Sequence, residues 1–148
     1  MPPRPEDVYL VDIVEACRAV TTFLDGLGPE EWVADPLRRD AVLYRLTVIG
    51  EAASRIGAGL RGRYDKIPWR EIVAFRNVAV HEYFAVEWHV VWRVARRQVP
   101  ELEANVMAIL RAEYPTIAAR LDAGSRPRTP GVWRGRVVIH DDFDGAGG

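Results

Sequence analysis

The sequence predicts an all-α protein, an antiparallel bundle of four to five helices with short connections. Apolar residues recur at three- and four-residue steps through most of the first 121 residues, which is the period of an amphipathic helix. No alternating pattern typical of a strand precedes residue 130. At 148 residues, the chain has the length of one domain with a sizeable core.

The first two helices are predicted from apolar faces and end signals. The first covers residues 6–27 and is expected to end at Gly28-Pro29. Asp35 and Pro36 indicate the start of the second, because aspartate is a good N-cap and proline fits the first helical position. Its apolar face carries Val42, Leu46, Ile49, Ala53 and Ile56, and three glycines are expected to break it, Gly57, Gly59 and Gly62.

Three more helical segments follow. A third helix is predicted from Pro68 through Ala79, and a fourth over residues 86–98. Pro100 has no backbone N–H, so it either kinks the fourth helix or starts a fifth at Glu101. The apolar pattern continues to Leu110 and is interrupted at Tyr114-Pro115.

The last part of the chain has a different composition. Residues 1–121 are expected to form the bundle, and residues 122–148 a flexible tail that begins with a linker rich in Gly, Pro, Ser and Arg. Residues 132–139 suit a short strand or the sheet edge of a partner. Trp133 is an aromatic anchor of the kind that often contacts a partner. A partner-binding tail and a functionless extension are both left open.

Composition limits the cellular setting. Hydrophobic residues make up 49% and charged residues 28% of the chain, which is typical of a globular protein. Cys17 is the only cysteine, so no disulfide can form within the chain, and a reducing, cytoplasmic location is expected. The first residues lack an apolar leader and no run of 18 apolar residues occurs, so neither secretion nor a membrane span is expected.

Charge is distributed unevenly along the chain. Residues 1–35 carry two basic and eight acidic residues, a formal charge of −6, whereas residues 36–99 carry twelve basic and six acidic residues, a formal charge of +6. The basic block can attract a polyanion such as RNA. A surface of solvated, salt-bridged side chains explains the same charge.

Two apparent motifs are rejected. Gly57–Gly62 has the letters of a dinucleotide-binding loop, but that loop requires a preceding strand and a following helix, and here a helix precedes and a basic loop is expected to follow. His81-Glu82 begins like a zinc-binding H-E-x-x-H motif, but position 85 is alanine, so the second ligand is missing. Neither a metal ion nor another cofactor is expected.

The candidate functional residues gather at the end of the third helix. Residues 75–84 contain Arg76, Asn77, His81 and Tyr83. A guanidinium group binds phosphate well and an imidazole exchanges a proton near neutral pH, so such a pair can cleave RNA without a metal. A solvated helix end would hold the same residues.

The spacing of Arg76 and His81 raises a geometric problem. Five residues correspond to about 140° around an ideal helix, so the two side chains do not converge on one phosphate from a single straight helix. Either the chain leaves the helix between them, or a second copy of the chain completes the site across a two-fold axis.

These residues, together with four further blocks, closely resemble HepT-like toxins of the HEPN superfamily over roughly residues 6–115. The four blocks are Ile49-Gly50-Glu51-Ala52, residues 67–72, Val91-Trp92 and residues 99–102, and the candidate residues themselves lie in the matching segment 76–84. The resemblance implies a small all-α bundle that forms a homodimer and acts as a metal-independent endoribonuclease in a toxin–antitoxin pair. The implied antitoxin is a minimal nucleotidyltransferase that can transfer AMP groups to Tyr83.

The resemblance and the residue chemistry together assign roles. Arg76 and His81 are the expected catalytic residues, Asn77 is expected to support the phosphate or the histidine, and Glu51 is expected to be a buried orienting acid. The competing hypothesis is a non-catalytic helical dimer that docks and assists a nucleotidyltransferase, since a fold does not settle a function.

Overall fold

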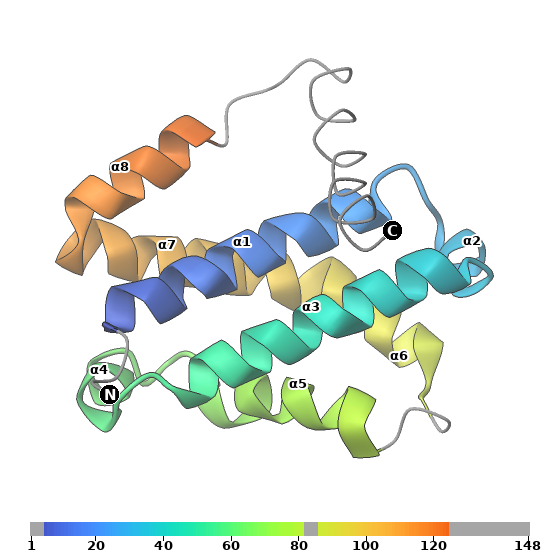
Figure 1. Cartoon of the computed structure of the whole chain (residues 1–148), viewed down its shortest axis with the longest axis horizontal. Helices are drawn as coiled ribbons and strands as arrows, with labels where there is room; N and C mark the ends of the chain where they lie inside the picture. The colour runs from blue at the N-terminus through green and yellow to red at the C-terminus, as the bar shows by residue number, and fades with distance from the viewer. Residues whose placement is uncertain (1–4, 82–85, 125–148) are drawn as a thin grey trace, which may run out of the picture.

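A computed structural model describes residues 5–81 and 86–124, and it confirms the predicted all-α bundle (Figure 1). Successive long helices run in opposite directions, and the described residues contain no strand. The long helices are α1 (Glu6–Leu24), α3 (Pro36–Ser54), α5 (Trp69–His81) and α7 (Val99–Glu113). The shorter ones are α2 (Pro29–Val33), α4 (Ala58–Arg63), α6 (Trp88–Arg93) and α8 (Pro115–Gly124).

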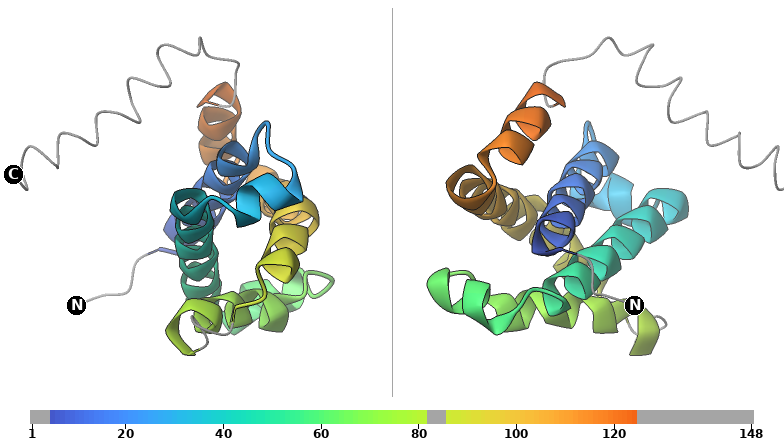
Figure 2. Two further views of the ribbon diagram at one scale, coloured as in Figure 1. Left: turned by 90° about the vertical axis from the view of Figure 1, so that its right-hand side faces the viewer. Right: turned by 60° about the vertical axis from the view of Figure 1, so that its left-hand side comes forward.

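Helix α3 packs between two other long helices. α5 packs on α3, α3 on α1, α1 on α7, and α8 on α7. Figure 2 shows α3, α5 and α6 bordering the interior from different sides. The core consists of apolar side chains from most of these helices, including Leu10, Ile13, Val14, Val20, Val42, Ile49, Leu60, Val99, Val106, Ile109 and Leu110.

The chain between α1 and α3 differs from the prediction. α1 ends at Leu24 and not near residue 27, because Gly26 adopts the left-handed conformation, with φ of 77°. Gly28 and Pro29 do not end α1: they begin the short helix α2, in which Glu31 accepts a hydrogen bond from the Gly28 N–H at 2.8 Å. The prediction missed this helix.

The start of α3 confirms its predicted N-cap, and its end corrects the reading of the three glycines. The Asp35 carboxylate accepts a hydrogen bond from the Arg38 N–H at 3.2 Å. The helix ends at Ser54, before the first glycine. Gly57 then precedes α4, and the other two glycines lie within it, so a short helix stands where a basic loop was expected. The rejection of a dinucleotide-binding loop stands, because a helix precedes the glycines.

The helical turns continue through Pro100, and α7 begins at Val99 and not at Glu101. α6 passes into a π-helical turn, η2 (Val94–Gln98), and this turn leads directly into α7. The Val99 N–H donates to the Val94 carbonyl five residues back, and Pro100 lies in the first turn of α7, where its missing N–H matters little. The wider turn therefore joins α6 to α7 through the proline.

Tryptophans pack the end of the bundle near α6. Trp32 is completely buried, and its ring centroid lies 5.8 Å from those of both Trp88 and Trp92. The Arg39 guanidinium lies over the Trp88 ring at 4.5 Å. Such rings stabilise α2, α3 and α6 against one another and are not a base-stacking platform. The predicted anchor Trp133 lies outside the described residues.

Arg18 ties α8 to the bundle. Its Nε donates to Glu103 at 3.0 Å and its Nη1 donates to the Leu121 carbonyl at 2.9 Å. α8, which the prediction missed, continues to Gly124, beyond the boundary expected at residue 121. The rest of the predicted tail lies outside the described residues. In the part of the chain that is described, no helix has the length and apolar character needed to span a membrane.

Candidate active site

Close contact between α3 and α5 places Arg76 beside α3. A Cβ atom on Gly50 of α3 would lie 2.5 Å from the Arg76 backbone nitrogen and 2.9 Å from the Val73 carbonyl oxygen. Only glycine fits at this distance, since real Cβ atoms do not approach backbone so closely. The next residue, Glu51, is therefore within reach of the Arg76 side chain.

The Glu51 carboxylate accepts hydrogen bonds from two arginines, one at each oxygen. Arg76 Nη1 lies 3.2 Å from Glu51 Oε1. Arg55, one turn further along α3, places Nε 3.1 Å and Nη2 3.0 Å from Glu51 Oε2. Hydrogen bonds from Arg55 first, and from Arg76 second, lower the pKa of the Glu51 carboxyl, against the opposing effect of desolvation. We call these three residues the arginine–glutamate cluster.

The cluster lies at the surface, which corrects one expectation. Glu51 was predicted to be a buried orienting acid, but its side chain is 48% exposed, and that of Arg76 is 42% exposed. The outward face of α3 carries Glu51, whereas the inward face is filled by Ile49 and Ala53. Glu51 does contact a predicted catalytic residue, Arg76, so a supporting role stays a prediction while burial is excluded.

The other predicted residues follow Arg76 along the chain. Asn77 is exposed, next to Arg76 on α5. His81 is the last residue of α5, and the helix is continuous from Arg76 to His81. The alternative in which the chain leaves the helix between these two positions is therefore wrong. The His81 side chain and the whole of Tyr83 lie outside the part of the chain that is described.

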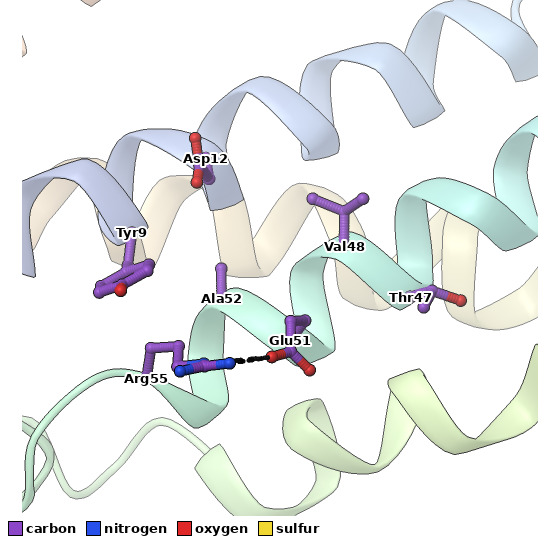
Figure 3. A pocket seen from close by; sticks show the side chains of 7 residues that line it. All are labelled: Tyr9, Asp12, Thr47, Val48, Glu51, Ala52 and Arg55. Carbon is purple, nitrogen blue, oxygen red and sulfur yellow. Dashed lines mark hydrogen bonds and ion pairs between the residues drawn. The ribbon is translucent and has the colours of Figure 1, made fainter. Parts of the chain in front are cut away.

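An open groove adjoins the arginine–glutamate cluster (Figure 3). It has a volume of about 460 Å³ and lies between α1 and α3. Its lining side chains are Tyr9 and Asp12 from α1, Thr47, Val48, Glu51 and Ala52 from α3, and Arg55 just after α3. Apolar surface with a few polar groups is typical of small-molecule sites.

Sequence reasoning missed two residues of this site. Arg55 pairs with Glu51 at i, i+4, a spacing that is visible in the sequence and favours an ion pair on a helix. Gly50 was part of a quoted block, but its close approach to α5 is a tertiary contact without a local pattern. Across residues 5–81 and 86–124, no group of three or more His, Cys, Asp or Glu side chains is placed to hold a metal ion.

The model of the family described as "Ribonuclease HepT-like" matches residues 13–109, from α1 to α7 and across all the candidate residues. The chain belongs to this HepT-like family of ribonucleases.

Named relatives agree with this assignment. The chain is 35% identical over 111 residues to "Putative RNase TTE0752" of Caldanaerobacter subterraneus subsp. tengcongensis, covering 75% of this chain and 96% of the relative. It is 33% identical over 102 residues to "Probable ribonuclease HepT" of Thermococcus cleftensis, covering 69% of this chain and 93% of the relative. No solved structure matches the chain.

Proposed function

We propose that this protein is a metal-independent endoribonuclease, the toxin of a cytoplasmic toxin–antitoxin system whose antitoxin is a nucleotidyltransferase. The observation that carries the proposal is the surface position of Arg76, which Glu51 holds on the helix that ends at His81. The names of the relatives support RNA as the substrate.

The proposed reaction is internal attack of a ribose 2′-OH on the adjacent phosphate of single-stranded RNA. The guanidinium of Arg76 stabilises the charge that develops on the phosphoryl oxygens. The imidazole of His81 exchanges the proton, a contribution of about 10²–10⁴-fold for a positioned acid or base. Asn77 supports the phosphate or the histidine. As the 2′-oxygen bonds to phosphorus, the bond from phosphorus to the 5′-oxygen of the next nucleotide breaks, and that oxygen leaves as a hydroxyl with the transferred proton. The products are a 5′-hydroxyl end and a 2′,3′-cyclic phosphate, which water can open to a 3′-phosphate.

A homodimer completes the proposed site. Positions 76 and 81 lie about 140° apart around one continuous helix, so they do not face one phosphate from the same protomer. Two copies related by a two-fold axis can instead bring Arg76 of one protomer and His81 of the other to a single crevice. The continuity of α5 through His81 supports this over a site within one chain.

Cleavage in the absence of metal tests the assignment. The purified protein should cut single-stranded RNA in the presence of EDTA, and Arg76→Ala and His81→Ala should each remove most of the activity. Arg111→Ala is a matched control, because Arg111 forms an exposed ion pair with Asp122 on α8, away from the site. Equal cleavage by all four proteins would overturn the assignment.

The proposed antitoxin acts at least in part by modifying Tyr83. An added AMP group places bulk and negative charge two residues from His81 and repels an RNA phosphate. Incubation with a nucleotidyltransferase partner and ATP should add one AMP mass to the peptide that contains Tyr83, as measured by mass spectrometry. Addition to another residue would contradict this.

Expression in cells separates the nuclease from the alternative docking module. The nuclease should arrest growth, and His81→Ala should relieve the arrest. A non-catalytic dimer that only assists a nucleotidyltransferase should leave growth unchanged with or without the substitution.

A further inference from the structure

The arginine–glutamate cluster carries an excess positive charge, unlike two other ion pairs among the described residues. Two guanidinium groups share the single carboxylate of Glu51. By contrast, Arg63 pairs with Glu113 and Arg111 pairs with Asp122, one cation to one anion. The cluster is therefore left with a formal charge of about +1 after pairing, at the edge of the groove between α1 and α3.

Exposure indicates that the cluster is not held for stability. The side chain of Arg55 is 61% exposed and that of Glu51 is 48% exposed. Ion pairs this exposed contribute little to folding. What Glu51 does accomplish is to hold two guanidinium groups side by side, each with a nitrogen besides those that contact Glu51 that can donate to a phosphate oxygen.

The adjoining groove has the chemistry to receive the rest of a nucleotide. Tyr9 and Ala52 contribute aromatic and apolar surface, and Thr47 adds a hydroxyl group (Figure 3). Base–aromatic contact favours binding of single strands without regard to sequence. Asp12, on the opposite wall, repels a phosphate, so the phosphate should lie at the Arg55 end and the base or ribose toward α1.

We infer that Arg55 is a second RNA-binding arginine, and that the groove between α1 and α3 binds the nucleotide next to the phosphate contacted by Arg76. The inference rests on the proposed ribonuclease function and adds to it the direction in which the RNA strand leaves the site. The strand crosses α3 from Arg76 toward Arg55 and then follows the groove between α3 and α1.

RNA binding, measured without cleavage, tests the role of Arg55. The probe is a single-stranded RNA oligonucleotide with 2′-O-methyl groups, which lacks the attacking hydroxyl. For the full-length protein, Arg55→Ala should raise the Kd about tenfold and lower the slope of log Kd against log salt by about 0.7. Arg111→Ala, which removes one equally exposed arginine, should change the Kd less than about twofold.

A bulky side chain placed in the groove tests whether the groove binds RNA. Thr47→Trp should raise the Kd several-fold, because the larger ring occupies the space between α1 and α3. Tyr44→Trp is the control, since Tyr44 is exposed on α3 and does not line the groove. Circular dichroism confirms that each variant is folded. If Thr47→Trp does not fold, Arg55→Ala decides the matter.

Each result separates this inference from the proposed function. If Arg55→Ala binds RNA as Arg111→Ala does, the inference is wrong, even when unmodified RNA is still cleaved by the wild type. If the wild type binds the probe but cleaves no RNA, the nuclease assignment fails while the Kd values still test Arg55. If Thr47→Trp changes the oligomeric state and not the Kd, a second copy covers the groove and the nucleotide subsite is wrong.

Discussion

Two arginine–glutamate pairs in this protein have the same chemistry but differ in exposure and in the number of contacts that the arginine makes. Arg18 lies between α1, α7 and α8, with both members of its pair with Glu103 only 26% exposed. Its three nitrogens all contact the protein: Glu103, the Leu121 carbonyl and, at 3.9 Å, the Met107 sulfur. Arg76 has one partner among the described residues, Glu51, and is 42% exposed. The number of contacts and the exposure distinguish an arginine bound within the fold from the one that we propose contacts RNA.

Arg76→Ala should separate the two roles most strongly. Loss of a guanidinium that stabilises the transition state should lower kcat by about 10²–10³-fold, or about 3–4 kcal/mol. The free energy of unfolding should fall by less than about 1 kcal/mol, because the pair with Glu51 is exposed. RNA cleavage and urea unfolding of the same preparation measure both. A loss of activity that only tracks a loss of folded protein would contradict the comparison.

Gly50→Ala should damage the site through the backbone. The added methyl group would clash with the Arg76 nitrogen, so α3 and α5 must separate, at a cost of about 1–3 kcal/mol in unfolding free energy. Cleavage should fall as well, because Glu51 no longer reaches Arg76. Gly62→Ala, where an added Cβ meets no atom within 4 Å, should leave cleavage near the wild-type value and raise the unfolding free energy by up to about 1 kcal/mol, because alanine favours the helix α4. Thermal unfolding and RNA cleavage rates of both variants measure these effects. Equal losses in Gly50→Ala and Gly62→Ala would contradict the close contact between α3 and α5.

Arg18→Ala should show the opposite pattern to Arg76→Ala. It leaves the half-buried Glu103 carboxylate without its arginine and releases the Leu121 carbonyl, so stability should fall by about 1–2 kcal/mol. RNA cleavage per folded molecule should stay unchanged, since Arg18 lies on α1 facing α7 and α8. Urea unfolding at a fixed temperature measures the loss. A fall in kcat without a fall in stability would place Arg18 in the site.

Glu51→Gln should have the smallest effect on folding. The amide keeps the shape and one acceptor oxygen but removes the charge, so unfolding free energy should change by less than about 1 kcal/mol at pH 7. Because the pKa of Glu51 is lowered in the folded state, its contribution is present above the ordinary glutamate pKa and is lost as pH falls through the folded value. The stability difference from the wild type should therefore shrink on acidification toward pH 3. A difference that grows there would contradict the ion pairing.

Local patterns predicted the long helices and failed for short ones. The apolar period located α1, α3, α5 and α7, and Asp35 marked the start of α3 correctly. α2 and α4 each have fewer than seven residues, too few for a period to show, and glycines at their starts resemble stop signals. Such helices form because buried side chains on them, Trp32 and Leu60, complete the core.

The candidate site was predictable only where its residues lie close together in the sequence. Arg76, Asn77 and His81 stand close together in the sequence and on one helix, so residue chemistry was enough to find them. The link to Glu51 depends on the register of α3 against α5, which Gly50 sets and which a single sequence does not reveal. Arg55 bonds to the same carboxylate of Glu51. Its position near Arg76 therefore depends on the contact between α3 and α5, which exists only in the folded protein.

The π-helical turn before Pro100 determines which way the tryptophans of α6 face. A π-turn holds one more residue than the α-helical turn it replaces. If the same residues instead ran as a regular α-helix, α6 would rotate by about 100° relative to α7, and Trp88 and Trp92 would turn away from Trp32. Deletion of one exposed residue of η2, for example Arg96, would allow the segment to run as α-helix with α6 kept in phase. The exposed residues of η2 should therefore tolerate the loss of one residue better than the gain of one.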